Sequence, residues 1–309
     1  MSQPYIIIPV HNRREFTLRC LACLHDQGIL AAMQVIVVDD GSTDGTHEAV
    51  NAEFPQVILL PGDGNLFLTG AVTLGMSHAM AQGATSMLWL NDDARPHPDA
   101  IIRVVAEAER LGGVAGGQGY VQTGPDTRWY FPLIFRGPKG LISVPVTQPK
   151  GMTAVQACRG NLVAISRNVV ERIGYPDARN IPHYNGDSDY TLRATQAGLA
   201  CAVVSDALIE ELDTIRTNNV SWLLSEIPIS TIWKAMFRKN SNFYPRMIWT
   251  FYSRHWGWRV LLDFPAPYLR LVVISLARCL FPRRLLLAVY ARRSHAWQTY
   301  AWTRHDGSQ

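Results

Sequence analysis

Short apolar runs alternate with helical patterns along the front of the chain, and this alternation limits the folds that the chain can adopt. Four runs have the length and character of buried strands, at residues 5–10, 34–40, 57–60 and 86–90. Between and after them, apolar spacing predicts helices over 13–26, 45–52, 69–82 and 98–111. Strands that alternate with helices form a parallel sheet covered on both faces, so the sequence predicts an α/β fold.

The pattern becomes less regular after the fourth helix. Residues 113–165 are richer in Gly, Pro and β-branched residues, which indicates mixed strands and loops. Helices are predicted again over 166–174 and 187–198, followed by a strand over 199–204. The second of these helices has Asp at its start and Gly at its end, as helix capping favours.

The formal charge of +4 hides a division of the chain into two parts. Residues 1–212 hold 15 basic and 21 acidic residues, whereas residues 213–309 hold 14 basic and 4 acidic residues and 7 of the 9 tryptophans. We therefore predict an α/β domain over 1–212 and a helical, basic and aromatic region over 213–309. That region contains two apolar helical stretches, at 266–281 and 283–301. A content of 48% hydrophobic and 17% charged residues excludes disorder, collagen and coiled coil.

Nothing in the sequence predicts a secreted or membrane-spanning chain. The N-terminus lacks the basic and apolar segments of a signal peptide, and no stretch reaches about 18 uncharged apolar residues. The five cysteines are odd in number and scattered, which argues against a disulfide framework. We expect a cytoplasmic protein.

Polar clusters follow each of the four front strands, where an open parallel sheet binds its ligands. They are His11-Asn12-Arg13, Asp39-Asp40-Gly41-Ser42, Gly62-Asp63-Gly64-Asn65 and Asn91-Asp92-Asp93. The sequence contains neither a G-x-G-x-x-G after the first strand nor a P-loop, so a phosphate ligand needs another partner. The pair Asp92-Asp93 fits Mg²⁺ or Mn²⁺, which one or two carboxylates and substrate phosphates bind together. A helix N-cap is the alternative role for this pair.

At this point the residues resemble a known family. The segments "YIIIPVHNR", "VIVVDDGSTDGT", "GNLFLTGAVTLGM", "LWLNDDARPHPDAI", "GNLVAISRNVVERIG" and "GDSDYTLRATQAG" occur in the order and spacing of family 2 glycosyltransferases. The resemblance covers roughly residues 4–205. It is strongest to bacterial rhamnosyl- and galactofuranosyltransferase-like enzymes that build surface polysaccharide. It implies a GT-A-type, Rossmann-like domain that binds a nucleotide sugar, with a largely helical C-terminal region behind it.

The resemblance also implies roles for single residues. Asp40 would accept from N3–H of uracil or thymine, and Asp93 would bind the metal, with Asn91 and Asp92 near the ribose or donor sugar. Asp187 would be the catalytic base. The nucleotide would also contact two loops, at Pro9, His11 and Arg13, and at Asp63 and Asn65.

The chain departs from the family pattern at two places. The family's Glu-Asp pair reads Gly186-Asp187, so its first carboxylate is missing. A His that serves many relatives as a further metal ligand is also missing from residues 203–216. Glu210, Glu211 or Asp213 could replace it.

Three interpretations compete for residues 213–309. Interleaved Trp, Tyr, Lys and Arg favour the surface of a membrane that carries anionic lipid. The second interpretation is a solvated helical cap on the first domain, or a contact between copies of the chain. Apolar residues on nearly all sides of the predicted helices favour such packing against protein. A nucleic-acid patch lacks any recognisable motif.

Together these features predict an inverting, metal-dependent glycosyltransferase at the inner face of a bacterial plasma membrane. It would transfer a hexosyl or deoxyhexosyl group from a UDP- or dTDP-sugar to a lipid-linked glycan. This reaction would belong to the synthesis of O-antigen, capsule or cell wall. A nucleotide-binding but inactive scaffold subunit is the alternative from another class. A response-regulator receiver also has paired aspartates after a strand, but the chain lacks its downstream Asp and Lys arrangement.

Overall fold

The structure is a computed structural model. It describes residues 3–123, 126–129, 133–137, 140–144, 150–212, 227–282 and 284–286. Asp213 and most of the expected helix over 283–301 lie outside these residues.

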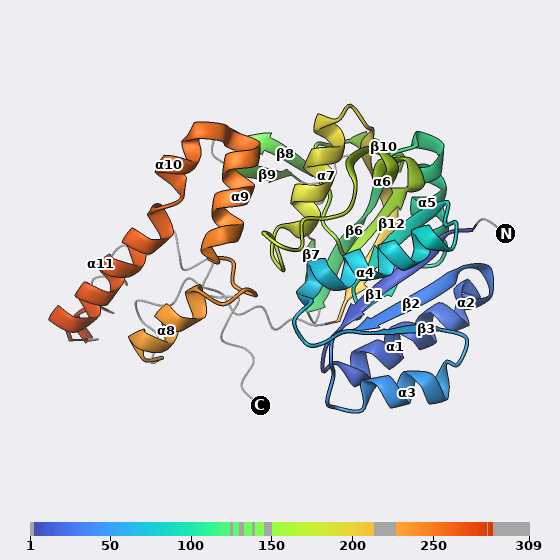
Figure 1. Cartoon of the computed structure of the whole chain (residues 1–309), viewed down its shortest axis with the longest axis horizontal. Helices are drawn as coiled ribbons and strands as arrows, with labels where there is room; N and C mark the ends of the chain where they lie inside the picture. Colours follow the sequence, from blue (N-terminus) through green and yellow to red (C-terminus); the bar gives the residue numbers. More distant parts are fainter. Residues whose placement is uncertain are drawn as a thin grey trace.

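The front of the chain forms the predicted parallel sheet (Figure 1). Its strands are β1 (Tyr5–Val10), β2 (Gln34–Asp39), β3 (Ile58–Pro61) and β4 (Ser86–Leu90), in the spatial order β3-β2-β1-β4. All neighbours in this half are parallel. Their carboxyl ends therefore meet at one edge, as the polar clusters require.

The other half of the sheet is mixed, as predicted for residues 113–165. β11 (Leu162–Ser166) lies antiparallel between β4 and β6 (Val114–Thr123), and β12 (Cys201–Glu211) runs parallel to β6. β12 starts within the predicted strand but continues to Glu211. Three short strands extend this half at its edges, namely β5 (Ala94–Pro96), β7 (Asp126–Trp129) and β10 (Met152–Ala154). β8 (Leu133–Gly137) and β9 (Gly140–Val144) form a separate hairpin.

Helices cover both faces of the sheet because alternate strand residues point to opposite sides. On one face Ile6, Ile8 and Leu88 pack with apolar residues of α1 (Arg14–Asp26), α2 (Ile29–Ala32), α3 (Thr46–Glu53) and α5 (Ala100–Leu111). On the other face Ile7 and Trp89 pack with α4 (Phe67–Ala81), α6 (Arg167–Ile173) and α7 (Gly186–Gln196). The two buried clusters together make an α/β fold with one sheet between two helical layers.

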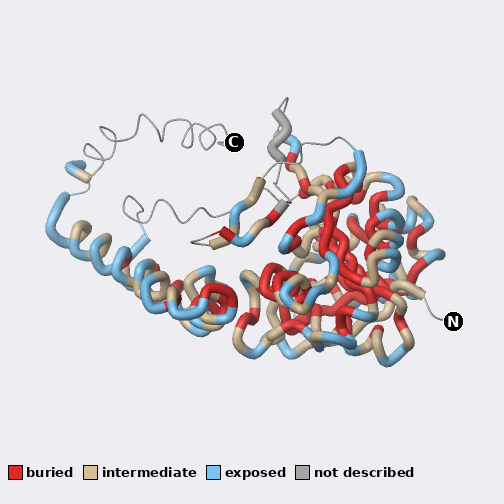
Figure 2. The backbone as a smooth tube through the Cα atoms, turned by 90° about the horizontal axis from the view of Figure 1, so that it is seen from above, coloured by how far each residue is buried: buried red, intermediate tan, exposed pale blue. Residues whose placement is uncertain are grey.

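The C-terminal region is helical, as predicted. It contains α8 (Ile229–Met236), α9 (Pro245–Trp256), α10 (Val260–Asp263) and α11 (Ala266–Leu280), with a 3-10 turn over Gly257–Arg259. α9 packs against α7 and the β8–β9 hairpin through Met247, Phe251 and Trp256, and Trp256 Nε1 donates to the carbonyl of Gly137 at 2.8 Å. α10 and α11 extend away from the sheet and are largely exposed (Figure 2). Among the described residues, the helical stretch Pro245–Leu280 is long and apolar enough to cross a membrane by length and composition alone.

Candidate active site

A cavity of about 370 Å³ opens where β1, β2 and β4 end. The first turn of α4 and the loop before α7 complete its wall. The sequence correctly placed most of its donor-site candidates together here. Those that line the cavity are Pro9, His11, Arg13, Asp40, Asn91, Asp92 and Asp93.

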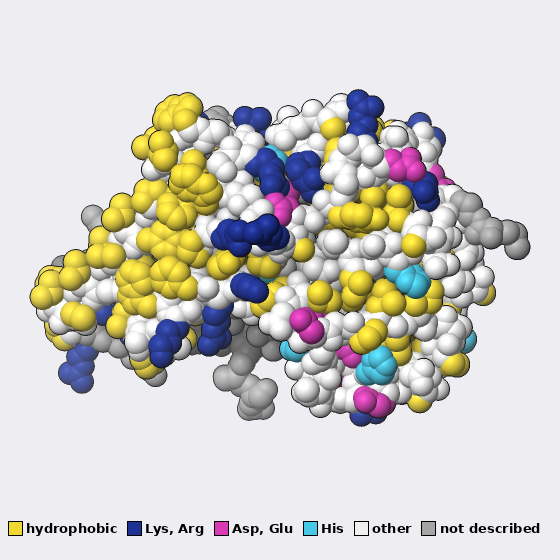
Figure 3. Space-filling model, in the orientation of Figure 1, with side chains coloured by type: hydrophobic (Ala, Val, Ile, Leu, Met, Phe, Trp, Pro, Cys, Tyr) yellow, Lys and Arg dark blue, Asp and Glu magenta, His cyan; other side chains and the backbone are white. Residues whose placement is uncertain are grey.

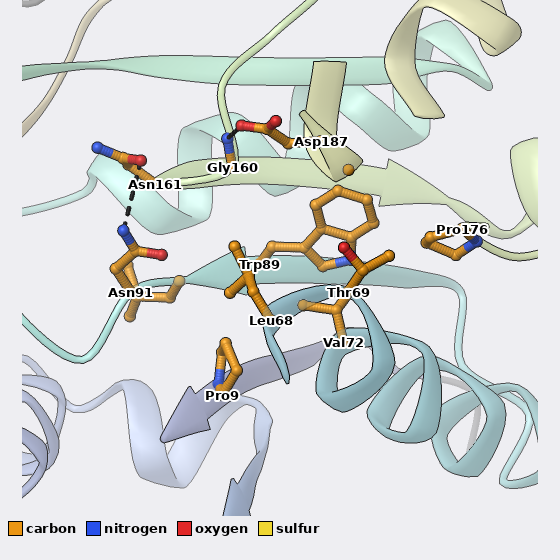
Figure 4. Close-up of a pocket in the computed structure, with 12 residues that line it drawn as sticks. Pro9, Leu68, Thr69, Val72, Trp89, Asn91, Gly160, Asn161, Pro176 and Asp187 are labelled. Carbon is orange, nitrogen blue, oxygen red and sulfur yellow. Dashed lines mark hydrogen bonds between the residues drawn. The ribbon is translucent and has the colours of Figure 1, made fainter. Parts of the chain in front are cut away.

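A smaller cavity of about 60 Å³ adjoins the first, and Pro9, Leu68 and Asn91 line both. Asp187, in the first turn of α7, lines the smaller cavity together with Gly160 (Figure 4). The residue expected to act as a base therefore faces the space next to the expected donor site.

Asp40 holds the loop that leads into α4. Its buried carboxylate accepts hydrogen bonds from the backbone N–H groups of Gly64, Leu66 and Phe67, at 2.9, 3.2 and 2.8 Å. His11 Nδ1 donates to the carbonyl of Asp40 at 2.6 Å, which ties the first loop to the second. Asp40 thus organises the wall of the cavity through its own hydrogen bonds.

Asp63 and Asn65 lie on the outer side of this loop. Both are exposed and line neither cavity, and Asp63 Oδ1 accepts from the backbone N–H of Asn65 at 2.9 Å. The contact with the base and ribose that the resemblance implies for these two residues remains a prediction.

Arg13 joins the two carboxylates that follow β4. Its Nε lies 3.0 and 2.8 Å from Oδ1 and Oδ2 of Asp92, and its Nη2 lies 3.0 Å from Oδ2 of Asp93. Burial raises the pKa of Asp92 to about 7, although the charge of Arg13 opposes the shift, and the charge of Asp93 adds to it. The positive charge of Arg13 beside the two carboxylates offsets part of the repulsion between them.

Asp92 and Asp93 could bind a divalent cation, but only together with a ligand that supplies further oxygens. No group of three His, Cys, Asp or Glu residues within the described ranges could hold a metal ion. Asp92 and Asp93 nevertheless give two carboxylates at the edge of a cavity large enough for a ligand. Mg²⁺ and Mn²⁺ can complete their coordination with substrate phosphates, so this pair fits a cation shared with a diphosphate and not one held by the protein alone.

Asp187 is held in place by backbone donors. Its Oδ2 accepts from the N–H of Gly160 at 2.7 Å, and its Oδ1 accepts from the N–H of Ser188 at 2.7 Å. Each carboxylate oxygen keeps a second lone pair for another partner. The side chain is fixed in direction while it can still accept a proton.

The missing carboxylate at position 186 has a steric explanation. Gly186 begins α7 directly against α4, and a Cβ at this position would collide with Oγ1 of Thr69. The close approach of the two helices therefore leaves no room for the Glu that the family pattern has here.

Two of the three acidic residues expected to replace the family's His, Glu210 and Glu211, lie on β12 beside β5, the strand that follows the aspartate pair. Glu211 is opposite Ala94 across the β12–β5 pairing, and its buried carboxylate accepts from Nδ2 of Asn161. Glu210 pairs with Arg95 at 3.8 Å, on the outside of the same strand. Neither joins Asp92 and Asp93 in a group that could hold a metal among the described residues.

His183 lines the larger cavity and was not among the sequence candidates. Its Nδ1 is buried and has no hydrogen-bond partner among the residues that the structure describes. Burial lowers the pKa of His183, against the charge of Asp187, so the imidazole is neutral at pH 7. Its position two residues before the Asn185-Gly186-Asp187 turn is the signal that could have identified it.

Comparison with protein families identifies the class. The model of glycosyl transferase family 2 matches residues 5–174, which is more than half of the chain. The chain therefore belongs to glycosyl transferase family 2, as its motifs indicated. A search of curated proteins finds no match.

Solved structures with the same fold include GalNAc-T7 with UDP, GalNAc and Mn²⁺. That structure is 12% identical, with a TM-score of 0.58 over 86% of this chain, and the match spans 58% of the GalNAc-T7 chain. Another is the mannosyltransferase PcManGT from Pyrobaculum calidifontis in complex with GDP-Man and Mn²⁺, at 18% identity and a TM-score of 0.54. That match covers 96% of this chain and 82% of the other. The predicted GT-A fold is confirmed.

Proposed function

We propose that this glycosyltransferase moves a sugar from a UDP- or dTDP-linked donor to a glycan acceptor, with inversion at the anomeric carbon. The observation that carries the proposal is the pair of adjoining cavities, with Asp92 and Asp93 at one and Asp187 at the other. The two cavities share Pro9, Leu68 and Asn91, so a donor whose diphosphate lies beside the aspartate pair can extend its sugar past these residues toward Asp187.

Asp187 acts as the general base in this proposal. Its carboxylate takes the proton of the acceptor hydroxyl, and the hydroxyl oxygen forms a bond to the anomeric carbon. The bond from that carbon to the donor diphosphate breaks, and the nucleoside diphosphate leaves on the opposite side. The backbone N–H groups of Gly160 and Ser188 keep the carboxylate in position during this step.

Asp93, with Asp92 beside it, would hold Mg²⁺ or Mn²⁺ together with the diphosphate. When bound, the metal would stabilise the charge that develops on the leaving group. Arg13 contributes a further positive charge at 2.8 to 3.0 Å from the same carboxylates. It also limits the repulsion between the two aspartates before a donor binds.

The proposed acceptor is a lipid-linked glycan at the inner face of a bacterial plasma membrane, in surface-polysaccharide synthesis. The family resemblance and the basic C-terminal region support this setting. Nζ of Lys239, in that region, lies 5.7 Å from the ring centroid of Phe67, which lines the larger cavity. A phosphate of a lipid-linked acceptor would suit this positive charge at the rim.

The test is a donor survey with the full chain. UDP-, dTDP- and GDP-sugars are titrated with and without Mn²⁺, thermal unfolding reports binding, and transfer is measured on a lipid-linked glycan. GDP-mannose belongs in the survey because the mannosyltransferase PcManGT binds it. We expect a UDP- or dTDP-sugar to raise the melting temperature, because a ligand at 100 times its Kd stabilises the folded state by about 2.7 kcal/mol. A response to GDP-sugars alone would exclude the donor class, and no response to any nucleotide would exclude the donor site.

An inactive scaffold subunit is the second candidate, and Gly186 in place of the family's Glu is the observation that favours it. A scaffold would bind a nucleotide sugar but transfer it to no acceptor. The transfer assay distinguishes the two candidates, because only the enzyme transfers a sugar, whereas both bind the nucleotide sugar.

A further inference from the structure

α11 exposes a complete apolar stripe. Five residues spaced at intervals of three and four lie on one side of this helix, and 41 to 72% of each is exposed. They are Leu269, Val272, Val273, Leu276 and Leu280. This spacing defines the apolar side of an amphipathic helix, and here that side faces away from the protein.

The opposite side of α11 is already occupied by α8. Leu271 is fully buried in a cluster with Ile232 and Met236, and Trp233 Nε1 donates to Oγ of Ser275 at 3.0 Å. These contacts fix the rotation of α11 about its own axis. The exposed stripe therefore cannot turn inward without breaking them.

Exposed apolar residues also occur in the two elements that precede α11. Trp258 is 72% exposed in the turn after α9, and Leu261 and Leu262 of α10 are 62 and 63% exposed. Figure 3 shows hydrophobic side chains gathered over the outer end of the C-terminal region, with Lys and Arg beside them. Contiguous exposed apolar surface of this kind marks a place of interaction. We call these three residues and the stripe of α11 the apolar face.

The charge around the apolar face selects a membrane over a second copy of the chain. The described part of the C-terminal region, residues 227–282 and 284–286, holds nine Lys or Arg residues and one Asp, and a second copy would bring the same positive charge against the first. Arg270 is exposed and lies about 100° from Leu269 around the helix, at the edge of the stripe. Arginine at the edge of an apolar stripe and tryptophan beside it suit the boundary between anionic headgroups and acyl chains.

The charges within the stretch Pro245–Leu280 favour a position at the surface over a crossing of the bilayer, although its length would allow a crossing. Met247, Phe251, His255 and Trp256 of α9 are buried against the catalytic domain, so the first half of the stretch Pro245–Leu280 is part of the protein interior. α10 and α11 remain for contact with lipid, and the charges of Asp263, Arg270 and Arg278 within them are costly at the centre of a bilayer. A position along the surface keeps these charges in water and leaves the contact of Leu271 with α8 intact.

We propose that the apolar face docks onto the interfacial layer of an anionic bilayer, with α11 parallel to the membrane plane. The inference deepens the proposed function and rests on it for the lipid-linked acceptor. It adds the surface that brings the enzyme to that acceptor. Acyl chains receive the stripe, and Arg270 contacts the anionic headgroups.

Liposome flotation of the full chain tests the proposal. Vesicles of phosphatidylcholine with 30 mol% phosphatidylglycerol are compared with pure phosphatidylcholine vesicles, at low and high salt. The variant Val273→Glu with Leu276→Glu places two charges in the stripe without touching the α8 contacts. Its control, Ile102→Glu with Ile142→Glu, makes the same change at two exposed apolar residues of the catalytic domain.

We expect the wild type and the control to float with the anionic vesicles, more weakly at high salt, and the stripe variant to lose at least tenfold in its bound-to-free ratio. Equal flotation of all three would overturn the proposal. Sedimentation equilibrium without lipid gives a second test. If the wild type is a dimer there and the stripe variant is a monomer, a second copy covers the apolar face and the proposal is also overturned. Transfer to a water-soluble acceptor analogue separates the two claims. Flotation without transfer contradicts only the proposed function, and transfer without flotation contradicts only this inference.

Discussion

Nη1 of Arg254 lies 2.7 Å from both carboxylate oxygens of Asp189, and this ion pair joins α9 to α7. The Asp189 side chain is only 1% exposed. Arg193 Nε, at 3.1 Å, and His255 Nε2, at 2.9 Å, complete its surroundings. The α/β sheet domain and the C-terminal region therefore meet at a cluster of charges around the buried carboxylate of Asp189.

Replacing Asp189 by Asn should destabilise the protein strongly. The change removes the buried charge that Arg193 and the partly exposed Arg254 share, and the loss of a hydrogen bond to a charged group costs about 1.5 to 3 kcal/mol. Asp206→Asn is the matched control, because Asp206 pairs with Arg103 at the surface and such a pair contributes about 0 to 1 kcal/mol. Urea unfolding measures both. Equal losses in the two variants would contradict a special role for the buried pair.

The same residue predicts how stability depends on pH. Burial raises the pKa of Asp189, but the hydrogen bond from His255 and the charges of Arg254 and Arg193 outweigh it, so the net pKa is lowered. A carboxyl with a lowered folded pKa stabilises the protein above its unfolded pKa of about 3.9, and this contribution is lost as the pH falls through the folded pKa. The free energy of unfolding should therefore fall more steeply below about pH 4 in the wild type than in Asp189→Asn. Parallel curves between pH 6 and pH 3 would refute the assignment.

Gly186 and Thr69 should show a strong interaction in a double-mutant cycle. Gly186→Ala alone overpacks the contact between α7 and α4 and should cost about 1 to 3 kcal/mol. Thr69→Ala alone should cost less, because Oγ1 of Thr69 is buried without a hydrogen-bond partner among the described residues. In the double variant the added methyl has room, and alanine also favours the helix. The two changes should then be non-additive in thermal unfolding, whereas simple additivity would show that Thr69 does not limit position 186.

Asp187→Asn should remove the base while it preserves the shape of the site. One side-chain oxygen remains to accept from Gly160, so the start of α7 is expected to stay in place. A general base contributes about 10² to 10⁴-fold to a rate, and we expect kcat to fall within that range while the KM of the donor stays constant. Asp206→Asn controls for the loss of one negative charge. Full activity of the Asp187 variant would show that another group takes the proton.

His183→Ala tests whether the unpartnered Nδ1 contacts the donor. A lost hydrogen bond to a charged ligand costs about 1.5 to 3 kcal/mol, so the donor KM should rise at least about tenfold. His183→Asn places an amide near the position of Nδ1 and should recover part of the affinity. His25→Ala, at an exposed site 65% accessible to solvent, is the control. An unchanged KM in His183→Ala would place the donor elsewhere in the cavity.

The sequence predicted the parallel half of the sheet best. β1 and β4 begin and end at the predicted residues, because each is an uninterrupted apolar run followed by polar residues. β12 is longer than predicted because polar residues in its second half, Ser205, Asp206, Glu210 and Glu211, interrupt the apolar run that predicts its first half. α2 has only four residues, too few to show a helical period.

The sequence predicted which residues lie at the ends of strands, but it did not predict the contacts between residues that are far apart along the chain. Asp40 and Asp92 follow strands, so their place at the cavity comes from the strand pattern alone. The bridge from Arg13 to Asp92 and Asp93 joins residues about 80 positions apart, and no local pattern encodes it. The sequence also did not show which side of α11 is exposed, because apolar residues occur on all sides of it. The structure shows that α8 covers the side that carries Leu271. The boundary expected near residue 213 remains a prediction.

α7 carries two aspartates with opposite tasks. Asp187 faces the cavity, and Asp189, two residues later, anchors α9. A C-terminal region exchanged between two such enzymes would therefore arrive without the carboxylate that its arginine requires, unless α7 were transferred with it. For protein engineering, the natural unit of exchange begins at Gly186 and includes Asp187, so a new C-terminal region cannot be joined to this protein without also replacing a residue that lines the cavity.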